Sequence, residues 1–208
     1  VLGFDFIELS IDETDERIAR LEWTKAQRQE ILSAIMDTEI PILSMCLSAH
    51  RRYPLGSADI KKQEMAIELL TKAVDLASDL GIRTIQLAGY DVYYEPKTIA
   101  SRNTFVENLA KCVAVAANKS VVLAIEIMDD PFINSISKFL SIKSQIPSPY
   151  LQVYPDLGNL SAWPENDVGH ELEKGISEIS QVHLKDTLAV TSDFEGKFKN
   201  VKFGEGCV

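Results

Sequence analysis

The sequence predicts an α/β protein with parallel strands, and two observations support this fold class. First, six segments rich in strand-forming residues alternate with segments that have the apolar spacing of helices. Such alternation is typical of right-handed crossovers between parallel strands. Second, polar residues gather after every predicted strand. This favours a (β/α)8 barrel, the TIM barrel, over a doubly wound open sheet of six strands, in which the ligand site lies at one switch point.

The predicted strands are short apolar runs, several of which end in polar residues. They are Phe6–Leu9, Ile42–Met45, Thr84–Leu87, Val121–Asp129, Leu151–Asp156 and Ile179–Asp186. The fourth run is almost unbroken in apolar residues, which is the pattern of a strand buried on both faces. It nevertheless contains Glu126, a carboxylate that an apolar core would not keep without a cation or a proton.

The predicted helices are recognised by apolar spacing and by their caps. Thr24 and Gln27 form a capping box that begins a helix over residues 24–37. Apolar residues at helical spacing extend over residues 59–80, and Gly81 ends that helix because glycine is the common C-cap. The remaining predicted helices cover residues 105–118, 135–146 and 166–175.

Both ends of the chain carry signals of further elements. Leu2 and Gly3 precede a predicted strand in the way that Leu80 and Gly81 do, so we expect the chain to begin at the end of a helix. Counting toward eight strands, the first strand and helix of the barrel and its last strand and helix would lie outside this chain. We therefore predict one truncated TIM-barrel domain over residues 1–208.

Composition limits the class of partner. The formal net charge of −10 repels polyanions, so nucleic acid and anionic membranes are disfavoured as partners. No run of about 18 apolar residues indicates a membrane span, and a cytoplasmic enzyme or binding protein fits best. Cys46, Cys112 and Cys207 are odd in number and lack C-x-x-C spacing, which favours free thiols.

Three acidic or imidazole side chains occur toward the ends of consecutive predicted strands. They are Glu126, Asp156 and His183. Neighbouring parallel strands lie about 4.8 Å apart, so these side chains would converge at one end of the sheet. Carboxylates and imidazole suit Zn, Mn, Co or Mg, and the ligand types do not separate these metals. The sequence therefore predicts a divalent metal site.

Other residues are predicted to contact a substrate. Glu8 ends the first strand, and Lys185 is turned the same way as His183 by strand alternation. The basic triplet His50-Arg51-Arg52 lies in a strand-end loop, where it could attract phosphate or simply be a solvated charge run. Near the C-terminal end of the chain, the spacing of Gly204 and Gly206 could cradle an anion.

The residues around the predicted strand ends resemble the bacterial L-ribulose-5-phosphate (L-xylulose-5-phosphate) 3-epimerases of the xylose-isomerase-like barrel superfamily. The resemblance covers essentially the whole chain, and it is carried by segments 4–13, 44–52, 86–94, 126–129, 154–163 and 183–187. It implies interconversion of L-xylulose 5-phosphate and L-ribulose 5-phosphate in L-ascorbate breakdown, with Glu126 as a catalytic base and Glu126, Asp156 and His183 as metal ligands. It also suggests a homodimer, and a second catalytic glutamate on a strand beyond Val208.

The chain departs from related epimerases of free keto-sugars at two positions. Those relatives carry a glutamate and a histidine where this chain has Phe132 and Asn159, so a pocket specific for a phosphorylated sugar is expected, with Asn159 as a substrate contact. Two alternatives remain open: an aldose-ketose isomerase of a sugar phosphate, of the hexulose-6-phosphate isomerase type, and a catalytically silent sugar-phosphate-binding barrel.

Overall fold

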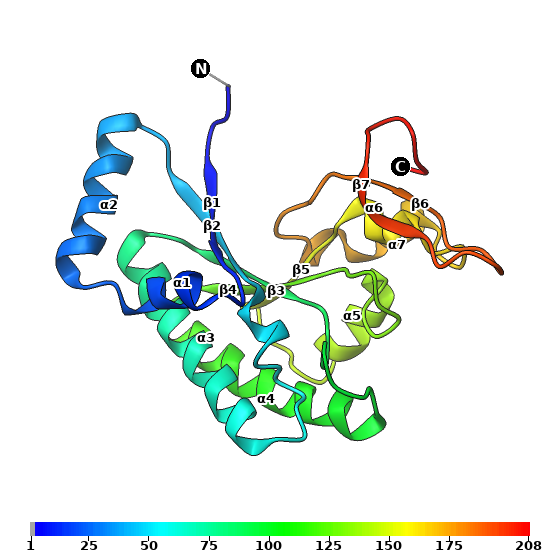
Figure 1. Ribbon diagram of the computed structural model, residues 1–208, viewed down its shortest axis with the longest axis horizontal. Coiled ribbons are helices and arrows are strands. Elements are labelled where there is room, and N and C mark those ends of the chain that lie inside the picture. The colour runs from blue at the N-terminus through cyan, green and yellow to red at the C-terminus, as the bar shows by residue number, and fades with distance from the viewer. Residues whose placement is uncertain (1–2) are drawn as a thin grey trace. The chain divides into compact units, whose positions relative to one another are not determined.

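A computed structural model describes residues 3–208 of the protein. The chain divides into two compact units: unit 1 comprises Val1–Leu87 and Asp91–Leu123, and unit 2 comprises Ala88–Tyr90 and Ala124–Val208. The larger sheet has five strands in the order β1-β2-β3-β4-β5 (Figure 1). These strands are β1 Ile7–Ile11, β2 Ile42–Leu47, β3 Thr84–Ala88, β4 Val122–Glu126 and β5 Leu151–Tyr154.

Unit 1 contains the first strands and the long helices. Strand β1 pairs with β2, and β2 pairs with β3, both in parallel as predicted. The helical segments of this unit are α1 Asp15–Ile18, η1 Ala19–Glu22, α2 Lys25–Thr38, η2 Ser48–Arg51, α3 Ile60–Leu80 and α4 Ile99–Ala117. Helices α3 and α4 pack against each other. Helix α3 contributes the fully buried Leu70 and Val74 to the core, whereas α2 buries no residue.

Local signals set the ends of these helices. Thr24 and Gln27 form the predicted capping box at the start of α2. Asp59 caps α3 by accepting a hydrogen bond from the Lys61 amide, and Gly81 ends this helix with a φ of 77°. A positive φ is the conformation that glycine adopts without steric cost. The predicted helices over residues 24–37 and 59–80 therefore agree with the structure to within one residue at each end.

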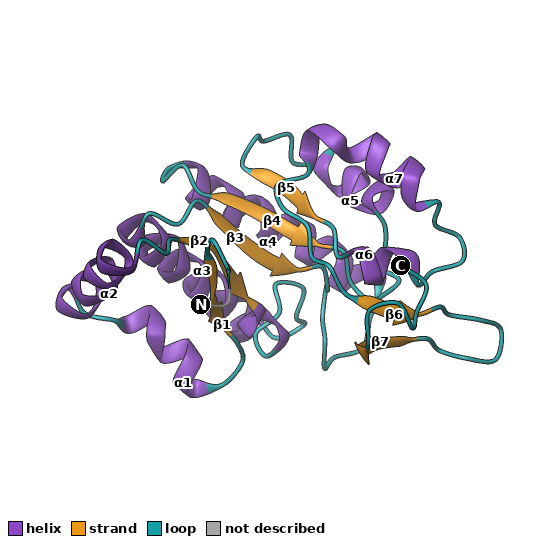
Figure 2. Cartoon of the chain, turned by 90° about the horizontal axis from the view of Figure 1, so that it is seen from above, coloured by secondary structure: helices purple, strands orange, loops and turns teal. Residues whose placement is uncertain are grey.

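Unit 2 contains the later helices and a hairpin. Its helical segments are α5 Ile136–Lys143, α6 Leu157–Ser161, α7 Val168–Gly175 and η3 Ile176–Glu178. Helix α5 packs against α7. Strands β6, Asp186–Leu188, and β7, Lys197–Val201, form an antiparallel pair that is separate from the larger sheet (Figure 2).

The predicted sixth parallel strand is not a regular strand. Residues 179–185 follow β5 through two isolated parallel bridges, one joining Ile179 to Val153 and the other joining His183 to Asp156. Among these residues Val182 and Leu184 are exposed, at 42% and 68%. The segment has few ladder hydrogen bonds and little apolar burial, so the prediction of a continuous strand over 179–186 was wrong, although its parallel direction was right.

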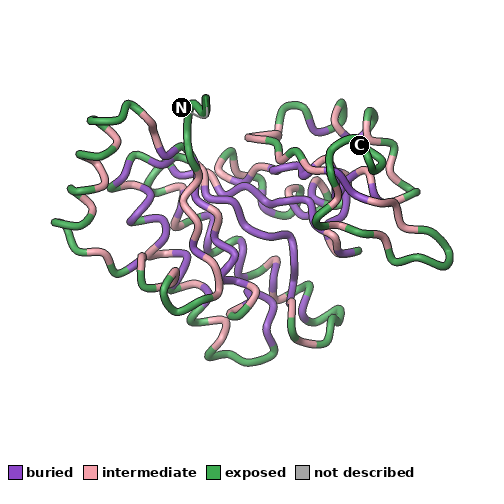
Figure 3. Tube along the Cα trace, turned by 45° about the horizontal axis from the view of Figure 1, so that its top comes forward, coloured by how far each residue is buried: buried purple, intermediate pink, exposed green. Residues whose placement is uncertain are grey.

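Burial follows the strands. Buried residues, purple in Figure 3, run along the sheet strands and the inward faces of helices, while β7 and the C-terminal residues are largely exposed. The three cysteines are free thiols, as predicted. None of the helices in residues 3–208 has both the length and the apolar character that crossing a membrane requires.

Candidate metal and active site

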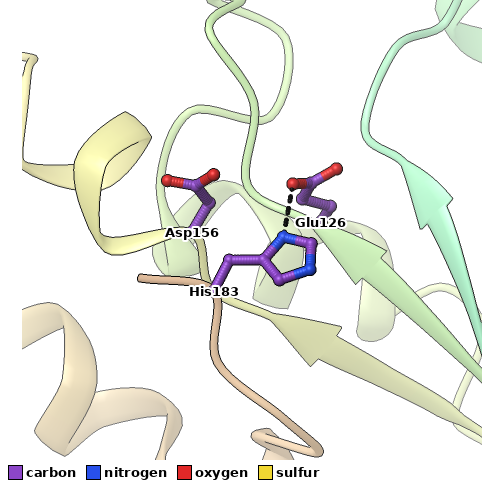
Figure 4. A group of neighbouring side chains, drawn as sticks. All are labelled: Glu126, Asp156 and His183. Atoms are coloured by element: carbon purple, nitrogen blue, oxygen red, sulfur yellow. Dashed lines mark hydrogen bonds and ion pairs between the residues drawn. The ribbon is translucent and has the colours of Figure 1, made fainter. Parts of the chain in front are cut away.

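Glu126, Asp156 and His183 converge within unit 2, as the sequence predicted. Glu126 is the last residue of β4, Asp156 follows β5, and His183 lies in the bridged segment that follows α7 and η3. Each offers one ligand atom, and these atoms all lie within 4.8 Å of one another. Figure 4 shows the imidazole of His183 beside the two carboxylates, with its Nδ1 2.9 Å from Oε1 of Glu126.

Glu126 is held by the strand that carries it. The preceding residues Leu123, Ala124 and Ile125 are fully buried, so the strand cannot turn without exposing apolar surface. Directly after Glu126, the Ile127 amide donates to the Tyr154 carbonyl at 3.1 Å. Residue 89 has to be glycine, because a Cβ at that position would lie 2.5 Å from the Glu126 carbonyl oxygen. Glu126 itself is 8% exposed, so its carboxylate is largely removed from water.

Asp156 has a structural role in addition to its place in the cluster. Its Oδ1 accepts a hydrogen bond from the Asn159 amide at 2.9 Å, which makes Asp156 the N-cap of α6. Helix α6 has only five residues and was not predicted, because so short a segment shows no periodicity. The Asp-x-x-Asn spacing was the available signal. Asp156 is 3% exposed.

His183 is positioned by backbone hydrogen bonds and by an aromatic contact. Its amide donates to the Pro155 carbonyl at 2.9 Å, and its carbonyl accepts from the Leu157 amide at 3.0 Å. The imidazole lies against the ring of Tyr154, with 4.4 Å between centroids. Because both backbone groups bond to residues on either side of Asp156, His183 is fixed next to Asp156. No motif in the sequence indicated the Tyr154 contact.

The donor set fits a divalent cation. Two buried carboxylates and one imidazole are the ligands that Zn, Mn and Co accept in proteins. The three ligand atoms lie within 4.8 Å of one another, close to the roughly 4.4 Å that two ligands of one ion can span. These residues could therefore hold a metal.

Lys185 and Asn159, both predicted substrate contacts, are joined to each other and to Asp156. The Lys185 ammonium lies 2.6 Å from Asn159 Oδ1 and 3.1 Å from Asp156 Oδ2. Asn159 is fully buried, and its side-chain amide donates to the Ile127 carbonyl at 2.8 Å. Both residues therefore belong to the surroundings of the cluster, with their polar atoms engaged by protein groups.

Gly204 and Gly206, the predicted anion cradle, hold an internal carboxylate. Their amides donate to Oδ2 of Asp186 at 2.8 and 3.0 Å, while Oδ1 accepts from the amides of Thr187 and Val208. Burial raises the pKa of Asp186, but these amides outweigh it and leave the pKa below its ordinary value. The amides of Gly204 and Gly206 thus hold Asp186, and binding of a substrate phosphate there would require displacing this carboxylate.

Glu8 and His50, two more predicted contacts, lie in unit 1. Glu8 was expected at the end of the first strand, but it is the second residue of β1, where its Oε2 accepts a hydrogen bond from the Ser44 hydroxyl at 2.5 Å. The His50 ring is buried, and its Nε2 donates to the Ala66 carbonyl at 3.0 Å. Burial lowers the pKa of His50 to about 4, so this ring is neutral near pH 7. A buried, neutral ring with a backbone partner is a core histidine, and we leave His50 out of the proposed phosphate contacts.

Arg51 and Arg52 differ in their surroundings. The Arg51 guanidinium lies over the ring of Tyr93, 5.4 Å from its centroid, which is a cation–π contact. Arg52 is exposed, lies over the ring of Tyr53, and pairs with Asp15 at 2.6 Å. Within the basic triplet, Arg51 and Arg52 thus carry the positive charge.

Strands that alternate with helices, with a carboxylate and imidazole cluster at the strand ends, define an α/β protein whose site can hold a metal. The sequence matches the xylose isomerase-like TIM barrel family over residues 1–208. SgbU of Escherichia coli is 56% identical over 206 residues, which cover 99% of this chain and 72% of SgbU. The L-ribulose-5-phosphate 3-epimerase UlaE of Escherichia coli is 51% identical over 207 residues, covering 100% of this chain and 70% of UlaE.

Solved structures give the same fold. An L-ribulose 3-epimerase is similar with a TM-score of 0.70 and 24% identity, over 88% of this chain and 60% of that one. The 3-keto-D-glucoside 4-epimerase YcjR of Escherichia coli has a TM-score of 0.71 and 18% identity, over 88% of this chain and 70% of that one. The chain belongs to the xylose isomerase-like TIM barrel family, and its fold class is the predicted one.

Proposed function

We propose that the protein is a metal-dependent L-ribulose-5-phosphate 3-epimerase that interconverts L-xylulose 5-phosphate and L-ribulose 5-phosphate. The observation that carries this proposal is the convergence of Glu126, Asp156 and His183, in a chain that is 51% identical to UlaE over 207 residues, which cover 70% of UlaE. A role in L-ascorbate breakdown, a cytoplasmic location and a homodimer are parts of the same proposal that come from the resemblance.

Glu126, Asp156 and His183 would hold the metal. When bound, a divalent ion supplies Lewis acidity, which stabilises the negative charge that develops on the oxygens of the ketose. The donor types admit Zn, Mn, Co or Mg. Of the three residues, Asp156 and His183 are fixed by hydrogen bonds to their own backbone surroundings, which leaves Glu126 as the group suited to exchange a proton.

Epimerisation at C3 requires removal of a proton next to the C2 carbonyl and return of a proton on the opposite face. Glu126 would take the proton from C3, which leaves an enediolate. Glu126 is 8% exposed, so little water competes with the substrate for this carboxylate. The partner that returns the proton is expected to be the second glutamate implied by the resemblance.

The residues that hold the substrate phosphate remain a prediction. Arg51 and Arg52 are the candidate phosphate contacts in the basic triplet, because His50 is buried and neutral. Replacing both by alanine should raise the KM for L-xylulose 5-phosphate with little change in kcat. Arg83→Ala, at an exposed position, is the matched control for loss of positive charge. An unchanged KM in the double variant would remove these arginines from the proposal.

The function is tested by proton exchange in deuterated water. The protein is incubated with L-xylulose 5-phosphate and Mn²⁺, and the products are followed by NMR. We expect deuterium at C3 and formation of L-ribulose 5-phosphate, both lost on chelation and restored by metal. Deuterium at C1 with formation of an aldose would instead establish the alternative, an aldose-ketose isomerase. Absence of exchange at every carbon in the metal-loaded protein would support the silent binding protein and overturn the enzyme proposal.

A further inference from the structure

The segment that carries His183 is irregular. Residues 179–185 make isolated bridges to β5 and no regular ladder, although the His183 amide and carbonyl bond to the backbone on either side of Asp156. A metal site needs its ligands held within a fraction of an ångström. Side-chain contacts add restraint to that of these backbone hydrogen bonds.

Asn159 connects two of the ligand-bearing segments. Its backbone amide donates to Oδ1 of Asp156, and its side-chain amide donates to the carbonyl of Ile127, the residue after Glu126. Asn159 is 0% exposed, so these hydrogen bonds do not compete with bulk water. Through Asn159, the end of β4 is joined to the start of α6.

Lys185 adds the third segment. It lies two residues after His183, and its ammonium contacts both Asn159 Oδ1 at 2.6 Å and Asp156 Oδ2 at 3.1 Å. The Lys185 stem crosses the first turn of α6 at Gly158, where a Cβ would lie 2.6 Å from Lys185 Cγ and 2.8 Å from its carbonyl oxygen. Glycine at 158 is therefore what permits the ammonium to reach Asp156.

Both carboxylate oxygens of Asp156 consequently have a donor. Oδ1 accepts from the Asn159 amide, and Oδ2 accepts from Lys185. Each oxygen keeps a second lone pair for an ion, but the carboxylate cannot rotate without breaking one of the two contacts. The orientation of this ligand is set before any ion arrives.

We propose that Asn159 and Lys185 form a positioning pair, which joins the segments of Glu126, Asp156 and His183 and holds Asp156 in the orientation that binds the metal. The inference rests on the proposed metal site. It assigns Lys185 a role that acts through Asp156, in place of the direct substrate contact expected from the sequence.

The change in metal affinity when Lys185 is removed separates a positioning role from two other roles. A cation that is merely close to the site repels the metal, so its removal would strengthen metal binding. A lysine that contacts only the substrate would change KM and leave metal affinity unaltered. A lysine that positions Asp156 weakens metal binding when it is removed, because partners of metal ligands are typically worth about 10–100-fold in affinity.

The test measures the dissociation constant for Mn²⁺ by titration calorimetry in four proteins: the unchanged chain, Lys185→Met, Asn159→Ala and the double variant. We expect each single variant to bind Mn²⁺ about 10–100-fold more weakly. The double variant should lose little more than either single variant, because a pair that acts as one unit gives non-additive losses. Lys202→Met is the matched control: its side chain is 83% exposed, it removes the same charge, and it should bind Mn²⁺ as the unchanged chain does.

Several results would overturn the inference. Unchanged or tighter Mn²⁺ binding by Lys185→Met, or losses that add fully in the double variant, would each do so. Lys185→Arg guards against a folding artefact: it keeps a cation near Asp156 and should retain more affinity than Lys185→Met, and equal losses would count against the pair. Tight Mn²⁺ binding without epimerase activity would refute the proposed reaction and leave the inference standing, whereas no Mn²⁺ binding by the unchanged chain would refute both.

Discussion

The two regions around His50 and His183 surround the same kind of side chain with different groups. His50 follows β2 and is buried in unit 1, with a backbone carbonyl as its hydrogen-bond partner. His183 lies beside β5 in unit 2, with Glu126 against its Nδ1 and Asp156 within ligand distance. One imidazole is packed as a neutral core group, and the other is available for a cation. The contacts that the tertiary structure supplies decide the role of each ring, since both histidines lie in or after a predicted strand.

The largest expected effect comes from removing the Glu126 carboxylate, which contacts His183 and has no counterpart beside His50. Glu126→Gln keeps the shape of the side chain but removes both the base and one anionic ligand. We expect kcat for L-xylulose 5-phosphate to fall by about 10²–10⁴-fold, the range for a general base. Steady-state kinetics measure this, with the exposed Glu173→Gln as control. Wild-type turnover by Glu126→Gln would refute its assignment as the base.

Metal binding sharpens the same comparison. His183→Gln removes a ligand atom, so we expect Mn²⁺ affinity to fall by more than the ~10–100-fold typical of an outer partner. His50→Gln should leave the affinity unchanged, because the His50 ring bonds to the Ala66 carbonyl in the other unit. Calorimetric titration of both variants gives the contrast. Equal losses in the two variants would show that the histidines do not differ as described.

The smallest effect is on the pH dependence of stability. Burial lowers the pKa of His50 from its ordinary 6.5 to about 4. As the pH falls below about 6.5, the unfolded chain takes up this proton first, so stability falls until the folded state is also protonated near pH 4. Between pH 7 and pH 5 the His50 term should cost about 2 kcal/mol of unfolding free energy.

Urea denaturation at these two pH values tests the His50 term. His50→Gln should lose about 2 kcal/mol less on acidification than the unchanged chain. Comparing the two proteins cancels the contribution of the carboxylates, which also favour unfolding at low pH. Identical losses in both proteins would mean that the His50 ring is protonated as readily in the folded chain as in the unfolded one.

Several helix starts were predictable. Capping side chains act on their own backbone neighbours, so the helices predicted from residues 24, 59, 135 and 166 have N-caps at Thr24, Asp59, Ser135 and Asp167. The helix predicted over residues 105–118 was placed too late, because α4 begins at Ile99 after a Thr98 capping box. Helix α6, which Asp156 caps, was missed because it is too short to show the apolar periodicity of a helix. The segment 179–185 was overestimated because an apolar alternation does not reveal how many partners a strand will find.

The candidate site divides in the same way. That Glu126, Asp156 and His183 would converge followed from their places on consecutive parallel segments, and the structure brings them together. The engagement of Lys185 with Asp156, and of Gly204 and Gly206 with Asp186, could not be foreseen, since hydrogen-bond partners distant in sequence are chosen by packing.

The sequence by itself determined the α/β alternation, the helix caps and the three donor residues at the strand ends, because these depend on local periodicity and on residue chemistry. Only the tertiary structure decided which polar groups are left for a ligand. Burial makes His50 a neutral core residue. Long-range contacts direct the Gly204 amide to Asp186 and the Lys185 ammonium to Asp156.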